Sequence, residues 1–189
     1  MKKNGILKLG IVLLIIAGVC GLILGGINQV TAEPIAIQAK KTIDEANKEI
    51  LPVASTFEEK KDVELDEGIL SLSEGKEGSE VKGYTIKVAP KGYGGAIEMM
   101  VGISTEGKIT GIKVLNHSET PGLGAHADSP DFSDQYKDKP TEKLSVVKGT
   151  ASKDTEIAAI TGATITSNAV TDGVNKAIEF YNSKLKGGN

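Results

Sequence analysis

The first long feature of the chain is an apolar run that contains no charged side chain. From Leu9 to Ile27 the sequence consists mainly of Leu, Ile, Val and Gly. About twenty such residues in a helix cross the hydrocarbon core of a bilayer, so the run predicts one transmembrane helix. A cleaved signal peptide is the alternative, because Val30, Thr31 and Ala32 offer a cleavage site. The run is longer than the apolar region of a signal peptide, which has roughly 7–15 residues, and this favours a retained membrane anchor.

The charges that flank the run predict its orientation. Lys2, Lys3 and Lys8 all lie on its N-terminal side. Because basic residues favour the cytoplasmic side of a membrane, we expect residues 1–8 to form a cytoplasmic tail and residues 9–27 to form the span. The rest of the chain is then extracytoplasmic, and the protein is a single-pass protein of the cell membrane.

Residues 28–82 are predicted to contain a linker helix and the start of the exported domain. Apolar side chains recur at helical spacing from Ala36 to Leu51, and Pro52 ends this pattern. The segment Ser55–Glu80 is acidic and rich in Ser, Gly and Lys. We expect it to form loops and at most one edge strand.

From Gly83 onward the pattern changes to that of strands. Tyr84–Val88 alternates between apolar and polar residues, and two more apolar runs follow at Ile97–Ile103 and Ile109–Leu115. Glu106-Gly107 lies between these two runs as a hairpin turn, so the sequence predicts an antiparallel sheet.

The remaining elements complete an α+β fold. A further strand is expected over Leu144–Lys148, and an amphipathic helix ends the chain. The prediction is therefore an N-terminal transmembrane helix followed by one domain, residues 83–189, in which helices flank an antiparallel sheet. The apolar stripe of the C-terminal helix comprises Val170, Val174, Ala177, Ile178, Tyr181 and Leu185.

Composition narrows the classes of function. The chain has 189 residues and a net charge of −3, with acidic and basic residues scattered, which gives no electrostatic case for nucleic-acid binding. Cys20 is the one cysteine, so the chain supplies neither disulfides nor the ligands of an iron–sulfur cluster. Redox chemistry would therefore need an organic cofactor or a partner.

A stretch rich in hydroxyl groups precedes the C-terminal helix, over Ile160–Asn168. We expect Thr166 or Ser167 to be the N-cap, and the free N–H groups of the first turn then favour an anion such as a phosphate. Gly162 and Ala163 lack bulk, which lets a ligand approach the backbone. An ordinary turn into a capped helix uses the same residue types, so the stretch alone leaves both interpretations open.

Two glycine-rich loops are further candidates. The loop Glu119–Gly124 offers a carboxylate, a hydroxyl and backbone groups to a flat polar ring, with Leu123 packed against it, although a plain inter-strand loop fits the same residues. Tyr93 could stack on a ligand or close the edge of the core. His117 and His126 flank the first loop without a third ligand, so no metal site is predicted. No Gly-x-Ser-x-Gly motif supports a hydrolase.

Two of these stretches together resemble a known family. Thr161–Ser167, with the sequence Thr-Gly-Ala-Thr-Ile-Thr-Ser, resembles the flavinylation motif of the FMN-binding domain family, and His117–Gly124 resembles its second hallmark. The match runs from about Gly83 to near Leu185. Within the family it looks closest to the G subunit of the Rnf ion-translocating complexes. The C subunit of the sodium-pumping NADH:quinone reductase shares both motifs and is the alternative, although its exported region is usually longer.

The resemblance implies a cofactor and its site. Thr164 would be esterified through its hydroxyl to the phosphate of FMN by a separate flavin transferase that uses FAD. Residues of the first motif would surround the phosphate, and the Glu119 loop would line the flavin with Leu123 against the isoalloxazine. The expected site comprises Thr164, Thr161, Gly162, Ala163, Thr166, Glu119, Thr120, Gly122, Leu123, Gly124 and Tyr93.

One position departs from the family pattern. The family often has Asp three residues before the first motif threonine, where this chain has Ala158. Asp154 and Glu156 lie nearby and are candidates to replace it.

The resemblance also implies partners. They would be the other Rnf subunits, including multispanning membrane subunits, a second flavin subunit and iron–sulfur subunits, which together pass electrons between ferredoxin and NAD. The chain lacks a nicotinamide-binding fingerprint and cluster ligands, so we expect no complete activity from it alone. A flavin-free extracytoplasmic binding module and a flavoprotein domain of an unrelated exported reductase are the other hypotheses.

Overall fold

The computed structural model describes residues 3–187, with side chains described from Leu7 onward. The chain divides into two compact units, Met1–Thr42 and Ile43–Asn189. The described part of the first unit is helical, and the second unit contains both sheets. The predicted α+β class is confirmed, whereas the boundary predicted at residue 83 stays a prediction.

A single helix, α1 (Lys3–Ile50), runs through the first unit and ends in the second. It is the one helix in the described part of the chain that is long and apolar enough to cross a membrane. The predicted span and the predicted linker helix are thus one continuous helix that includes Pro34, and it ends at Ile50, two residues before Pro52.

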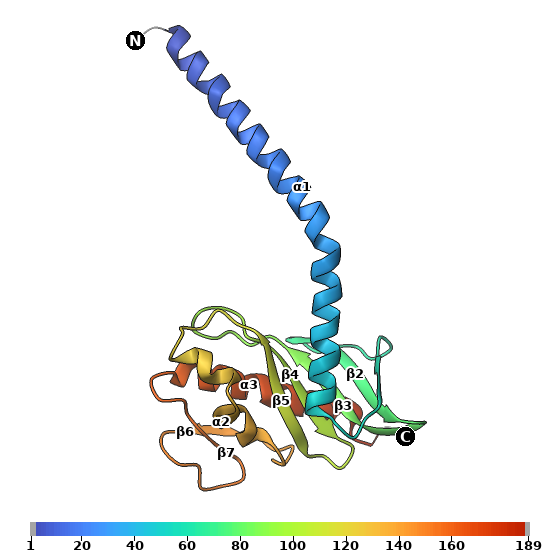
Figure 1. Cartoon of the computed structure of the whole chain (residues 1–189). Helices are drawn as coiled ribbons and strands as arrows, with labels where there is room; N and C mark the ends of the chain where they lie inside the picture. Colours follow the sequence, from blue (N-terminus) through green and yellow to red (C-terminus); the bar gives the residue numbers. More distant parts are fainter. Residues whose placement is uncertain (1–2, 188–189) are drawn as a thin grey trace. The chain divides into compact units, whose positions relative to one another are not determined.

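The main sheet of the second unit has five antiparallel strands in the order in which they follow one another along the chain (Figure 1). The three predicted strands and their hairpin turn are present, with Gly107 in the left-handed conformation at φ +77°. The strands are β1 (Thr56–Glu59), β2 (Ile69–Glu77), β3 (Glu80–Val88), β4 (Glu98–Ser104) and β5 (Ile109–Asn116).

The expectation of loops and at most one edge strand over residues 55–80 was wrong, because this segment forms both β1 and β2. In β2 the buried residues are Ile69, Leu72 and Gly75, three positions apart, and the register shifts near both ends of the strand. These irregularities remove the alternation by which a strand is recognised in a sequence.

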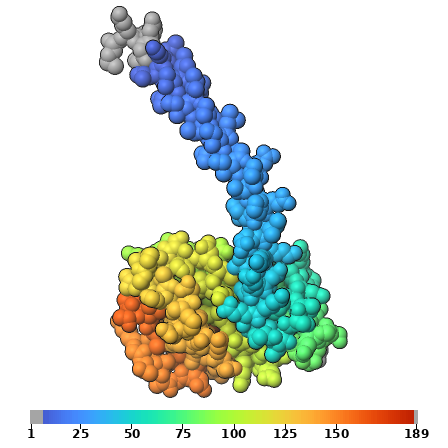
Figure 2. Space-filling model, viewed as in Figure 1, coloured from blue at the N-terminus to red at the C-terminus, as the bar shows by residue number. Residues whose placement is uncertain are grey.

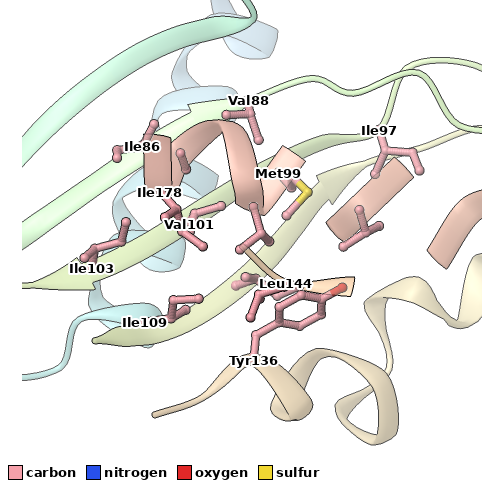
Figure 3. Close-up of a cluster of buried hydrophobic side chains, with 14 of the residues drawn as sticks. Ile86, Val88, Ile97, Met99, Val101, Ile103, Ile109, Tyr136, Leu144 and Ile178 are labelled. Carbon is pink, nitrogen blue, oxygen red and sulfur yellow. The ribbon is translucent and has the colours of Figure 1, made fainter. Parts of the chain in front are cut away.

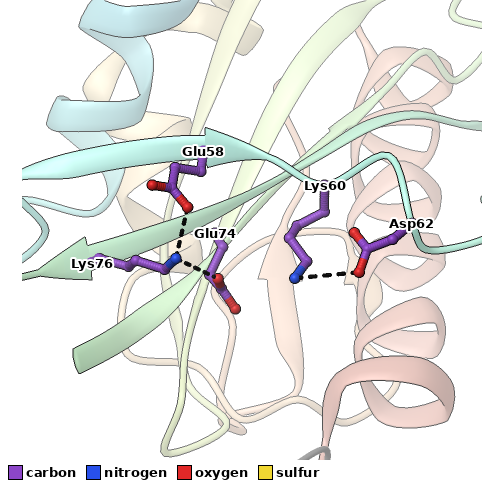
Figure 4. A network of polar contacts seen from close by, with 5 residues as sticks. All are labelled: Glu58, Lys60, Asp62, Glu74 and Lys76. Carbon is purple, nitrogen blue, oxygen red and sulfur yellow. Dashed lines mark hydrogen bonds and ion pairs between the residues drawn. The ribbon is translucent and has the colours of Figure 1, made fainter. Parts of the chain in front are cut away.

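Charged side chains of this segment pair across the strands (Figure 4). Glu58 and Glu74 lie directly opposite each other, and Lys76 Nζ lies 2.7 Å from the Glu58 carboxylate and 3.2 Å from that of Glu74. The hydrogen bond from Lys76 lowers the pKa of Glu58. Lys76 thereby offsets the repulsion that two opposed carboxylates would cause in the sheet.

One face of the sheet is covered by α3 (Thr164–Phe180), which continues as a single π-helical turn, η3 (Tyr181–Leu185). The predicted apolar stripe forms this contact, since five of its members are buried and Leu185 is partly buried. Figure 3 shows Ile178 among side chains of β3 and β4. The hydrophobic core therefore lies between α3 and the sheet.

The last turns of α1 pack on the opposite face of the sheet, where Ala46 and Ile50 contact Met100. In Figure 2 the end of α1, where light blue passes into cyan, lies against yellow-green atoms of the same unit. Glycines make the close approach possible: a Cβ atom on Gly83 would lie 3.1 Å from Leu51 Cδ1 and 2.5 Å from the Ile103 carbonyl oxygen. The sheet is therefore covered on both faces.

The segment between β5 and α3 forms short elements. They are η1 (Gly124–Asp128), α2 (Pro130–Ser133), η2 (Asp134–Tyr136), β6 (Ser145–Val147) and β7 (Glu156–Ala158). The strand expected over Leu144–Lys148 is present as β6, but it pairs in parallel with β7 in a separate two-stranded sheet.

We expect Gly83→Ala to lower the free energy of unfolding by about 1–3 kcal/mol, because the new methyl group overpacks against the Ile103 carbonyl and Leu51. Urea unfolding of the purified chain, followed by circular dichroism, measures this loss. Gly111→Ala is the matched control, since its Cβ would lie 3.8 Å from Ile50. Equal stability of the two variants would contradict the proposed close packing.

Candidate functional site

A cavity of about 500 Å³ lies where the N-terminus of α3 meets two loops that flank strands β4 and β5. Three segments far apart in the sequence form its wall, which places nine of the eleven predicted site residues together. The lining residues are Tyr93, Glu119, Thr120, Leu123, Gly124, Gly162, Ala163, Thr164, Ile165 and Thr166.

Thr164 is the first residue of α3 and is half-buried at the cavity. Ala163 occupies the cap position, and no side chain caps the helix. The expectation that Thr166 or Ser167 would be the N-cap was therefore wrong. The first N–H groups of a helix have no partner within it, and together with the helix dipole they favour an anion beside Thr164.

The hydroxyl of Ser167 instead fixes the turn that leads into the helix. It donates a hydrogen bond to the Ala163 carbonyl and accepts one from the Ile160 N–H, both at 3.0 Å. The Ser167 carbonyl in turn accepts from Thr171, whose hydroxyl lies 2.7 Å from the buried hydroxyl of Tyr136. Burial raises the pKa of Tyr136, so this phenol is neutral at physiological pH. A continuous set of hydrogen bonds thus joins the motif to the core.

Glu119 is the buried carboxylate of the site, with 5% of its surface exposed. Its Oε1 accepts a hydrogen bond of 2.8 Å from the Gly94 N–H, and its Oε2 accepts one of 2.5 Å from the Thr166 hydroxyl. The side chain therefore connects the loop before β4, the loop after β5 and the first turn of α3.

Glycines keep this contact tight. A Cβ atom on Gly124 would lie 2.5 Å from Glu119 Oε2 and 2.6 Å from Thr166 Oγ1, and one on Gly92 would collide with Glu119 Oε1. A Cβ atom on Gly94 would collide with the Ser118 carbonyl. The glycine-rich sequence of both loops is thus required by the close approach of their backbones.

Large apolar side chains stand exposed at this cavity. Tyr93 is 71% exposed, Ile165 58% and Leu123 43%. Exposed apolar side chains around a concave site are typical of a ligand-binding or interaction surface. Ile165 was not predicted from the sequence as a site residue. Its position outside the buried stripe of α3 was the feature that could have indicated it.

The structure places Thr161 and Gly122 in a neighbouring cavity of about 640 Å³ rather than in the first one. Leu123 lines both cavities, and a Cβ atom on Gly162 would lie 3.0 Å from Leu123 Cδ2. Gly162 has φ +78°, a conformation that favours glycine. The residues that line this second cavity are Gly122, Leu123, His126, Ser129, Asp131, Phe132, Gln135, Ala158, Ala159, Ile160 and Thr161.

Ala158, the departure from the family pattern, is held through its backbone. Its N–H donates to Gln135 Oε1 at 2.7 Å, and its carbonyl accepts from Gln135 Nε2 at 3.3 Å. Glu156 and Asp154 were the two carboxylates considered as replacements, and neither lines a cavity described above. Glu156 instead accepts hydrogen bonds from Ser152, and these lower its pKa. At the position where the family often has an acid, Gln135 therefore holds the backbone of β7 through its two hydrogen bonds to Ala158.

His117 supports the Glu119 loop. Its Nδ1 accepts a hydrogen bond of 3.1 Å from the Glu119 N–H, and its Nε2 lies 4.0 Å from Asp128. Among the described residues, no group of three or more His, Cys, Asp or Glu is placed to hold a metal ion.

Comparisons with known proteins agree with the predicted resemblance. The model of the FMN-binding domain family matches residues 92–179. The G subunit of the Na(+)-translocating ferredoxin:NAD(+) oxidoreductase complex of Acetobacterium woodii is 43% identical, with 96% of this chain and 94% of the relative covered. The G subunit of the ion-translocating oxidoreductase complex of Methanosarcina acetivorans is 33% identical, with 95% and 96% covered.

A solved structure has the same fold. The C subunit of the Na(+)-translocating NADH-quinone reductase of Parabacteroides distasonis aligns with a TM-score of 0.54 at 24% identity, over 63% of this chain and 64% of that one. The two relatives described above, which match over nearly their whole length, are both named as G subunits, and this was the resemblance predicted to be closest.

We expect Ser167→Ala to lower the free energy of unfolding by about 1–3 kcal/mol, because it leaves the part-buried Ile160 N–H without its acceptor. Amide hydrogen exchange should speed up over residues 160–164. Ser183→Ala is the control, since that exposed hydroxyl donates only to the nearby Phe180 carbonyl. Unchanged exchange over residues 160–164 would show that Ser167 does not fix the turn.

Proposed function

The chain belongs to the family of G subunits of ion-translocating oxidoreductase complexes, and on this premise we propose that it is a membrane-anchored electron carrier with FMN bound covalently to Thr164. The observation that carries the proposal is the position of Thr164, at the start of a 17-residue helix and on the wall of the cavity. A phosphate esterified to this hydroxyl would lie where helix N–H groups favour an anion.

The residues of the cavity fit FMN. A volume of about 500 Å³ lies within the range of roughly 300–1,000 Å³ typical of cofactor sites. The phosphate end would be held by the first turn of α3, and exposed Tyr93, Leu123 and Ile165 offer apolar surface to a flat ring system. FMN supplies one- and two-electron transfer, which no side chain of the protein provides.

Attachment requires a second enzyme that transfers FMN from FAD to the threonine. In the proposed step the Thr164 oxygen attacks the phosphorus of FAD on the riboflavin side. The P–O bond of the anhydride breaks, AMP leaves, and the hydroxyl proton is released. A flavin transferase would catalyse this step, and the exposed Gly162 leaves the backbone accessible next to the acceptor hydroxyl.

The anchor gives the proposed location. Helix α1 has the length and apolarity of a membrane span, and Lys3 and Lys8 precede most of its apolar residues. By the positive-inside tendency, the N-terminus would be cytoplasmic and the domain extracytoplasmic. There the domain would pass electrons within a complex that contains multispanning, flavin and iron–sulfur subunits. Such a complex would couple ferredoxin and NAD to ion transport, as the name of the Acetobacterium relative states for that protein.

Three alternatives differ from the proposed function in what they predict. A role as the C subunit of the NADH:quinone reductase is disfavoured, because relatives named as G subunits align over nearly the whole chain. A flavin-free binding module predicts that the purified protein has no covalent flavin. Copurification with multispanning subunits separates the proposed function from an unrelated exported reductase.

Thr164→Val should abolish covalent flavin and leave the fold intact, because the substitution removes the nucleophilic hydroxyl and keeps the volume. In-gel fluorescence of the denatured chain, expressed with a flavin transferase, measures the attachment. Thr150→Val is the matched control and should keep its flavin, since that exposed residue lies outside the motif and outside the residues that line the two cavities. Fluorescence that persists in Thr164→Val would refute the assignment.

A further inference from the structure

Among the described residues that line the cavity, Glu119 alone has a charged side chain. The carboxylate is 5% exposed, so water screens it weakly. Among the side chains described from Leu7 to Gly187, no basic group forms an ion pair with Glu119. The carboxylate therefore lies at the cavity wall with no described basic side chain within ion-pair distance.

Two neutral groups hold this carboxylate in place. The Gly94 N–H and the Thr166 hydroxyl each donate to one of its oxygens, at 2.8 Å and 2.5 Å. Gly92 and Gly124 approach the carboxylate so closely that a Cβ atom at either position would collide with it. Its charge is therefore fixed in position relative to the first turn of α3, where Thr164 lies.

We propose that Glu119 tunes the reduction potential of the bound flavin, lowering it by placing a fixed negative charge at the cavity. This rests on the proposed function, because it requires FMN at Thr164. Reduction adds electrons to the cofactor, and a nearby unscreened negative charge opposes that addition. The protein thereby makes the cofactor a stronger electron donor than it would be in a neutral cavity.

Two substitutions can separate the effect of the Glu119 charge from the effect of its hydrogen bonds. In Glu119→Gln the amide can still accept from Gly94 and can donate to the Thr166 oxygen, so the contact survives while the charge is lost. In Thr166→Val the charge stays, but one donor that offsets part of it is lost. The two variants should therefore shift the potential in opposite directions.

The experiment is a spectroscopic redox titration of the full-length chain, purified after expression with a flavin transferase. Glu119→Gln should shift the equilibrium at least about tenfold toward the reduced form, which is about 59 mV more positive for a one-electron step. Thr166→Val should give a more negative potential. Glu106→Gln removes the same charge from the exposed β4–β5 turn, outside the residues that line the cavity, and should leave the potential unchanged.

Each outcome decides between the claims. If the wild-type chain carries no FMN, the proposed function fails, and this inference fails with it. If wild type and Glu119→Gln both carry FMN and titrate at the same potential, only the tuning role is overturned. If Glu119→Gln does not fold or load, as judged by circular dichroism and fluorescence, Thr166→Val decides, and an unchanged or more positive potential overturns the role.

Discussion

The pair of hydrogen bonds accepted by Glu119 is the contact on which the geometry of the cavity depends. They join the loop before β4, the loop after β5 and the first turn of α3. Burying a carboxylate is costly unless its oxygens have donors, so the two hydrogen bonds favour the arrangement in which these three segments meet. This contact requires glycine at positions 92 and 124, because a side chain at either position would displace the carboxylate.

A second constraint holds the helix itself. The core between α3 and the sheet fixes the helix axis, and the hydrogen bonds from Tyr136 through Thr171 to Ser167 fix its start. Thr164 thus begins a helix that these contacts hold in place, although it directly follows a glycine-containing turn. A cofactor attached to Thr164, as proposed, would be held at a fixed place, which electron transfer needs. If the domain is extracytoplasmic, as proposed, a covalent tether would also prevent loss of the cofactor.

The sequence predicted the core strands and the C-terminal helix well, because their apolar positions repeat at strand and helix periods, as in Tyr84–Val88. It failed at β2, where bulges break the alternation. It predicted the strand that forms β6 but not β7, the three-residue strand that pairs with it in parallel. The cap of α3 was also misjudged. The two hydroxyl groups expected to cap the helix form other contacts instead. Thr166 donates a hydrogen bond to Glu119, and Ser167 accepts one from the Ile160 N–H.

The candidate site residues were predicted from motif resemblance more than from a physical pattern, and resemblance does not show how they are arranged. Nothing in the sequence separated Thr161 and Gly122 from the cavity that holds Thr164. Nor did it indicate Gln135, whose amide binds both backbone groups of Ala158 across 23 positions of sequence. Long-range contacts of this kind depend on the packing of η2 against β7, which no local pattern reports.

Peptide mass spectrometry of the chain purified from the membranes of its native host would measure directly whether Thr164 carries FMN. We expect the peptide that contains Thr164 to carry the mass of one FMN joined with loss of water. An unmodified peptide from a host that has an active flavin transferase would contradict it. The motif would then be an ordinary turn into a helix.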